Sequence, residues 1–181
     1  MELEACYGEI QSGHLEQVGY ETYCDLLDEV IKEEKGVKVE PDPDIIIDIN
    51  VSSFIPDNYI ENGNQKIEVY QAIALCRTDE DIRKIKEDIE DRFGKAPEEV
   101  DSLLEIAKIK QLCKQAGVHK IMQKQENVVF YFNQETFNLD VAKLLEKYKS
   151  RIKFSTGFVP YVTYKLEDKN RVVEEIEDFL C

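Results

Sequence analysis

Basic residues are scarce in this chain of 181 residues: 23 Lys and Arg stand against 38 Asp and Glu, which gives a formal net charge of -15. Contacts with nucleic acid phosphates need Lys or Arg side chains, and no predicted face carries a stripe of several. The composition therefore predicts no direct DNA binding by this chain and no binding to anionic membranes. It suits a basic partner, although acidic charge also serves solubility alone.

Long apolar runs and paired cysteines are also absent. No segment approaches the length of a membrane span, and no basic-then-apolar stretch opens the chain, so we expect a cytoplasmic protein. The five cysteines lie far apart without a C-x-x-C pair, and neither His14 nor His119 has a cysteine close in sequence. This spacing predicts no metal site and favours cysteines that act as small core residues in a reducing compartment.

Catalytic signatures are missing as well. The sequence contains no G-x-x-x-x-G-K-[ST] phosphate loop, no G-x-S-x-G, no H-E-x-x-H and no dinucleotide fingerprint. We therefore predict no catalytic residue and no cofactor in this chain, and a titration with a fluorescent ATP analogue should stay flat. The alternative is an independent small cytosolic enzyme with a carboxylate site, but among 38 carboxylates chance proximity explains any close pair.

The chain divides into four predicted segments. Residues 1–15 are weakly patterned, and residues 16–36 form an amphipathic helix that ends at Gly36. Residues 37–44 contain Pro41 and Pro43, which cannot continue a helix, so this stretch is a linker. Residues 45–181 are predicted to fold as one domain, since 43% of the chain is hydrophobic, enough to form a core.

Within 45–181, apolar periodicity predicts grouped helices and hairpin-paired strands. This pattern is typical of an α+β fold with a mixed or mostly antiparallel sheet packed with helices, here preceded by the extended amphipathic helix. Thr78 is the expected N-cap of the second helix, Gly94 and Gly117 end helices, and Pro97 opens one. The expected helices are 66–75, 79–92, 97–116, 141–148 and 172–180; the expected strands are 45–51, 118–122, 128–132, 152–154 and 159–166.

An acidic surface is predicted on the helix 79–92. Helical spacing places Asp81, Asp88 and Asp91 on one side, with Lys84 among them, while Ile82, Ile85 and Ile89 form the buried stripe. Such a face is either simply solvated or an electrostatic docking surface for arginines.

Several short motifs, in order along the chain, resemble transcription-repair coupling factors. Their spacing is sensible from Gly8 to Met122, and after that only the pattern of strands and helices agrees. The motifs are Gly8-Glu9-Ile10-Gln11-Ser12-Gly13-His14, Val18-Gly19-Tyr20, Ile55-Pro56-Asp57-Asn58-Tyr59-Ile60 and Asp91-Arg92-Phe93-Gly94 with Pro97.

The resemblance implies a terminal regulatory domain of a larger protein. Full-length members are ATP- and Mg-dependent DNA translocases that displace stalled RNA polymerase and recruit the repair protein UvrA. Their terminal domain docks on an amino-terminal UvrB-like module and masks UvrA binding, an autoinhibitory role. The acidic positions of that contact match Asp88 and Asp91, and Gln11 and Gly13 match the end of the translocase motif. Met1 to Tyr7 depart from the family pattern, so a translocation role for Gln11 does not carry over.

The segment boundaries are testable by limited proteolysis. We expect the first cuts within residues 36–44, because two prolines interrupt helix there and a lone amphipathic helix needs a partner to bury its stripe. Early cleavage inside 79–116 would show that the boundary is misplaced.

Overall fold

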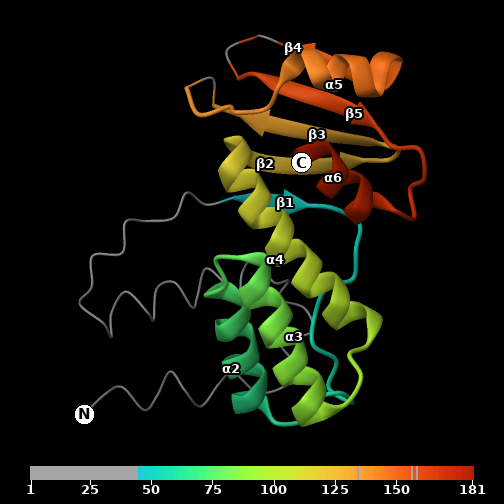
Figure 1. Ribbon diagram of the computed structural model, residues 1–181. Coiled ribbons are helices and arrows are strands. Elements are labelled where there is room, and N and C mark those ends of the chain that lie inside the picture. The colour runs from blue at the N-terminus through green and yellow to red at the C-terminus, as the bar shows by residue number, and fades with distance from the viewer. Residues whose placement is uncertain (1–44, 134, 156, 158) are drawn as a thin grey trace, which may run out of the picture. The chain divides into compact units, whose positions relative to one another are not determined.

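The structure, a computed structural model, describes residues 45–181 except residues 134, 156 and 158 (Figure 1). Segments 1–15, with Gln11 and Gly13, 16–36 and 37–44 lie outside the described residues, and the expectations for them stay predictions. The described residues form two compact units, one of residues 52–104 and one of residues 45–51 and 105–181. Folding of 45–181 as one domain also stays a prediction.

The first unit contains helix α2 (Gly63–Ala74), helix α3 (Asp79–Phe93) and the first part of helix α4 (Glu98–Ala116). Helix α2 begins three residues before its predicted start at Lys66. The Asn62 side chain caps it by accepting hydrogen bonds from the N–H groups of Asn64 (3.0 Å) and Gln65 (3.3 Å). The sequence-based boundary was wrong because Asn62-Gly63 is more typical of a turn than of a helix start.

The loop that precedes α2 is held to it by two polar contacts. The N–H of Ile55 donates to the hydroxyl of Tyr70 (2.8 Å), and the buried ammonium of Lys66 pairs with the carboxylate of Asp57. A buried charge needs such a partner, so the pair fixes the path of the loop. The core of this unit is built from fully buried aliphatic side chains, namely Ile60, Ile73, Ile89, Val100 and Leu103.

The second unit is built on a five-stranded mixed sheet of order β1-β2-β3-β5-β4. Strand β1 pairs parallel with β2, and all other neighbours pair antiparallel, which confirms the predicted α+β class with a mixed, mostly antiparallel sheet. Helices α5 (Val141–Tyr148) and α6 (Val172–Leu180) match their predicted bounds. The strands are β1 (Ile46–Asp48), β2 (Val118–Lys124), β3 (Asn127–Phe132), β4 (Ile152–Ser155) and β5 (Tyr161–Lys165).

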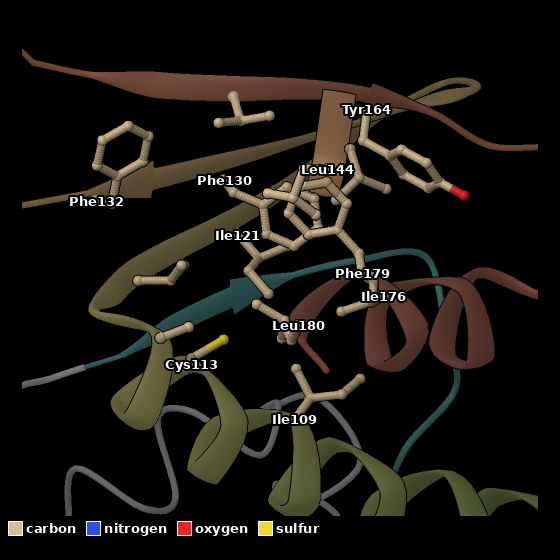
Figure 2. Close-up of a cluster of buried hydrophobic side chains, with 14 of the residues drawn as sticks. Ile109, Cys113, Ile121, Phe130, Phe132, Leu144, Tyr164, Ile176, Phe179 and Leu180 are labelled. Atoms are coloured by element: carbon tan, nitrogen blue, oxygen red, sulfur yellow. The ribbon is translucent and has the colours of Figure 1, made fainter. Parts of the chain in front are cut away.

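One face of this sheet forms the core of the second unit. Alternate residues of the strands point to it, and the end of α4 together with α5 and α6 packs on it (Figure 2). Phe179 of α6 stacks on Phe130 of β3 with ring centroids 4.2 Å apart, and also contacts the rings of Tyr148 and Tyr164. Figure 2 draws this cluster with Ile109, Cys113, Ile121, Phe132, Leu144, Ile176 and Leu180 around it.

Gly117 ends α4, as predicted, and no other residue would fit there. Its φ is +72°, and a Cβ would lie 2.0 Å from the carbonyl oxygen of Thr136. Both the left-handed backbone and the close approach of a neighbouring chain segment require glycine. The chain thereby turns directly from α4 into β2.

A polar network joins α6 to the sheet edge. Glu175 accepts hydrogen bonds from the hydroxyl of Tyr164 (2.6 Å), from Arg151 (2.9 Å) and from the N–H groups of Glu167 and Asp168. Burial raises the pKa of Glu175, but the hydrogen bonds and the guanidinium together hold it below its ordinary value. The carboxylate is thus stabilised in its ionised form.

Replacement Glu175→Gln should lower the free energy of unfolding by about 1–3 kcal/mol at neutral pH, because charge-assisted hydrogen bonds to Tyr164 and Arg151 are lost. Since the folded pKa is depressed, this contribution is present above the unfolded pKa and is lost as the pH falls through the folded pKa. Urea unfolding should show a smaller difference in the free energy of unfolding between the parent protein and Glu175→Gln at acid pH than at neutral pH.

The matched control is Glu174→Gln, which removes an exposed carboxylate paired with Arg171 on the same helix. It should change stability by less than about 1 kcal/mol. A Glu175→Gln loss that stays constant from neutral to acid pH would contradict the electrostatic origin of the effect.

Candidate functional site

Helix α3, which carries the predicted acidic face, starts in a capping box. The Thr78 hydroxyl accepts from the N–H of Asp81 (3.2 Å), and the Asp81 carboxylate accepts from the N–H of Thr78 (3.0 Å). The first turn, Asp79 to Asp81, is acidic, which suits the positive end of the helix dipole. At the other end Gly94 adopts a φ of +88° and ends the helix, so both predicted limits are confirmed within one residue.

The buried side of α3 is narrower than predicted. Ile89 is fully buried, whereas Ile82 and Ile85 are only half-buried. Their spacing alone placed all three on one stripe, but how deeply each is covered depends on the neighbouring elements. Polar contacts supplement this apolar burial in holding the helix within its unit. One of them is an ion pair between Lys86 and Asp101 (2.6 Å).

The carboxyl end of α3 is tied to the preceding loop. The Tyr59 hydroxyl donates to the carbonyl oxygen of Gly94 (2.6 Å), and its ring meets that of Phe93 edge-on. Burial, and then the charges of Glu90 and Asp101, raise the pKa of Tyr59, so the hydroxyl keeps the proton that it donates. The last turn of α3, where Asp88 and Asp91 lie, therefore has a defined position within the unit.

Asp81 belongs to the start of the helix. Its carboxylate accepts from the N–H groups of Thr78 and Arg77 (3.1 Å). The hydrogen bonds of Thr78 and Arg77 lower the pKa of Asp81 below its ordinary value. Because these contacts already occupy the carboxylate, any docking role for Asp81 would compete with the cap of its own helix.

Asp88 is exposed and paired. Its carboxylate lies 3.2 Å from the guanidinium of Arg92, one turn further along, and the side chains are 63% and 39% exposed. Arg92 also lies 3.6 Å from Glu68 of α2 and covers the ring of Phe93. Arg92 is not among the site residues predicted from the sequence, although its spacing of four residues from Asp88 is the signal for such a pair.

Asp91 is exposed, three residues from Asp88 on the same side of α3. Within the described part of the chain, no ion pair or side-chain hydrogen bond engages its carboxylate. The structure thus brings together one paired and one free carboxylate on the last turns of α3. Lys84, expected among them, lies 3.6 Å from Glu80 instead.

Neither Glu175 nor Cys76 has the pKa shift that a catalytic acid or a reactive thiol needs. Glu175 is a partly buried carboxylate with a side chain 14% exposed, yet its depressed pKa keeps it ionised, whereas a general acid needs a raised pKa. Burial, and then the charge of Asp81, raise the pKa of Cys76 to about 11, so its thiol stays protonated. Cys76 and Cys113 are both free and buried, as core residues would be.

Among residues 45–181, with the three gaps, no group of three or more His, Cys, Asp and Glu is placed to hold a metal ion. None of the helices that the structure describes combines the length and apolar character needed to cross a membrane.

Comparison with known proteins points to one family. The family model of the TRCF domain matches residues 49–144. The transcription-repair-coupling factor of Staphylococcus haemolyticus is 36% identical over 123 residues, which cover 67% of this chain and 10% of that protein. Those of Rickettsia typhi and Borreliella burgdorferi are 32% and 28% identical, cover 92% and 93% of this chain, and each alignment takes in 15% of the relative.

A solved structure supports the fold. The crystal structure of the C-terminal domain of a transcription-repair coupling factor aligns with a TM-score of 0.65 at 22% identity, covering 75% of this chain and 89% of that one. This chain spans only 10–15% of the length of the curated relatives above. The resemblance inferred from the motifs is confirmed, and because the family model matches more than half of the sequence, the chain belongs to the TRCF domain family, the C-terminal domain of transcription-repair coupling factors.

Proposed function

We propose that this domain is the autoinhibitory module of a transcription-repair coupling factor. In this proposal α3 docks on basic residues of an amino-terminal UvrB-like module and masks the surface that binds UvrA. The full-length protein is an ATP-dependent DNA translocase that displaces stalled RNA polymerase at lesions, and this chain supplies regulation rather than catalysis. The observation that carries the proposal is the free carboxylate of Asp91 beside the Asp88–Arg92 pair, on an exposed turn inside the matched segment.

The two carboxylates contribute differently to such a contact. A partner arginine meets Asp91 without displacing any side chain that the structure describes, whereas at Asp88 it competes with Arg92, already 3.2 Å away. Exposed ion pairs contribute little on their own, about 0–1 kcal/mol, but a charge-assisted hydrogen bond that an interface partly desolvates contributes about 1–3 kcal/mol. Two such contacts are enough to shift a closed-to-open equilibrium by tens-fold.

Arg92 also makes the Asp88 and Asp91 surface of α3 selective for its docking partner. Its guanidinium lies near Glu68 and Asp88 at once, so it links α2 to α3 and orients the Asp88 carboxylate. A partner must therefore match a local pattern of one free carboxylate and one shared carboxylate, rather than a general negative charge. We infer that the docking strength is set mainly at Asp91.

The double replacement Asp88→Arg and Asp91→Arg should release the amino-terminal module in the full-length protein. Repulsion then replaces attraction at both positions, and UvrA should bind about tenfold tighter or more. Binding of UvrA to full-length protein, measured by biolayer interferometry, gives the readout. The melting temperature should hardly change, because exposed charges away from the core contribute little to stability.

Glu61→Arg is the matched control, since it reverses an exposed acidic side chain in the loop before α2 and leaves the α3 surface intact. It should leave UvrA binding as in the parent protein. If the double variant folds normally and UvrA binding does not change, the acidic surface of α3 is only solvated.

Single neutral replacements separate the two carboxylates. Asp91→Asn should weaken docking more than Asp88→Asn, because Arg92 already draws on the charge of Asp88. The comparison uses the same UvrA-binding assay on the full-length protein. An equal loss for both replacements, or a larger loss for Asp88→Asn, would show that Arg92 does not compete with the partner.

A further inference from the structure

The sheet of the second unit has a second face, which lies outside the hydrophobic cluster. The residues that alternate with the core positions point to it, and among the residues that the structure describes, those of α4, α5 and α6 in the hydrophobic cluster lie on the other side of the sheet. We call it the open face. The strand register arranges it in three cross-strand rows: Ile46, Lys120, Tyr131, Tyr161 and Ser155; Asp48, Met122, Val129, Thr163 and Lys153; Lys124, Asn127 and Lys165.

The open face is basic although the chain is acidic. It carries the four lysines of these rows against the single carboxylate of Asp48. Lys124, Lys153 and Lys165 are exposed, and Lys165 lies 3.8 Å from Glu126 in the adjoining turn. Charge is segregated along the chain as well: residues 105–181 hold 13 basic and 11 acidic residues, whereas residues 52–104 hold 7 and 13.

Two tyrosines occupy the middle of the first row. Tyr131 of β3 and Tyr161 of β5 are direct cross-strand neighbours, half-buried, with ring centroids 5.7 Å apart. The ammonium of Lys120, from the next strand, lies 5.9 Å from the centre of the Tyr131 ring. Neither tyrosine belongs to the core cluster, so their rings are not needed to hold the helices.

We propose that the open face binds single-stranded nucleic acid. Aromatic rings on an antiparallel sheet provide a stacking surface for unpaired bases, and surrounding lysines attract the phosphates. Thr163, Ser155 and Asn127 lie in the same rows, and their hydroxyl and amide groups are suited to hydrogen-bonding base edges or sugars. The ligand is single-stranded because stacked and paired bases of a duplex do not reach a sheet-borne ring.

This inference revises the expectation that the chain makes no contact with nucleic acid, and it is independent of the α3 surface. The expectation rested on the absence of a basic stripe in the sequence. Two of the four lysines come from β2 and the other two from the neighbouring strands β4 and β5, some thirty residues further along the chain, and only the sheet brings the two pairs together. An acidic polypeptide is the competing occupant, but carboxylate side chains have no flat ring to stack on the tyrosine pair, whereas bases do.

Fluorescence anisotropy of labelled 12-nucleotide dT and U strands with the full chain tests the proposal. We expect saturable binding to one or both, weakening as salt rises, with a slope of log K against log salt of about -2 to -3 for three or four phosphate contacts. Tighter binding of U would identify RNA as the ligand, and tighter binding of dT would identify single-stranded DNA. A 12-base-pair duplex should bind at least tenfold more weakly.

Variants locate the binding on the open face. Tyr161→Ala should weaken it about tenfold, as should Lys153→Glu, whereas Tyr161→Phe should retain it because the stacking ring remains. Lys143→Glu on α5, exposed away from the open face, is the charge-matched control and should leave binding nearly unchanged. Circular dichroism melting checks that each variant folds. If Tyr161→Ala does not fold, Thr163→Glu takes its place as the variant that should weaken binding on the open face.

Three results would overturn the proposal. One is the absence of binding at low salt, and another is binding that Lys143→Glu weakens as much as Lys153→Glu does. The third is displacement of the strand by poly-L-glutamate at equal charge concentration, together with indifference to Tyr161→Ala, since the occupant would then be an acidic polypeptide.

Discussion

Burial of one face of the sheet is the constraint on which the second unit depends. Phe130 at the centre of β3 meets Phe179 of α6 at 4.2 Å, and side chains from α4, α5 and α6 close around this pair. Fully burying an aromatic side chain contributes about 1.5–3 kcal/mol, so the final helix, too short to be stable alone, is held by this contact together with its other buried side chains. The assignment of each strand residue to the core face or to the opposite face follows from this burial.

The same alternation leaves a second face whose side chains are free for other purposes. In a β-strand, consecutive side chains point to opposite sides, so a fixed core face also fixes the identity of the opposite one. The bulge in β2 between Val118 and Lys120 keeps Ile121 on the core side and Lys120 on the other. The basic rows and the tyrosine pair are therefore a consequence of how the core is packed.

In the first unit an aliphatic core is supplemented by polar contacts that fix its loop and its central helix. Its loop is tied by the buried Lys66 ammonium, and its central helix by a capping box at Thr78 and a hydroxyl contact from Tyr59. These contacts hold the last turns of α3, with Asp88 and Asp91, in place without burying them. A rigid helix with exposed charges suits a reversible contact, because little ordering remains to be done on binding.

The sequence by itself determined the helices and strands of this protein, because the signals that start and end them act between residues close in the chain. Caps at Thr78, Gly94 and Gly117 and the periodicity of apolar residues need only near neighbours, and they placed most helix limits correctly. Short motifs also identified the family. The tertiary structure alone decided that Asp81 serves its own helix and that Ile82 and Ile85 are half-buried. It also decided that lysines of β2 share one face with those of β4 and β5. These features depend on register and on the depth of packing, which arise between segments that are far apart in the chain.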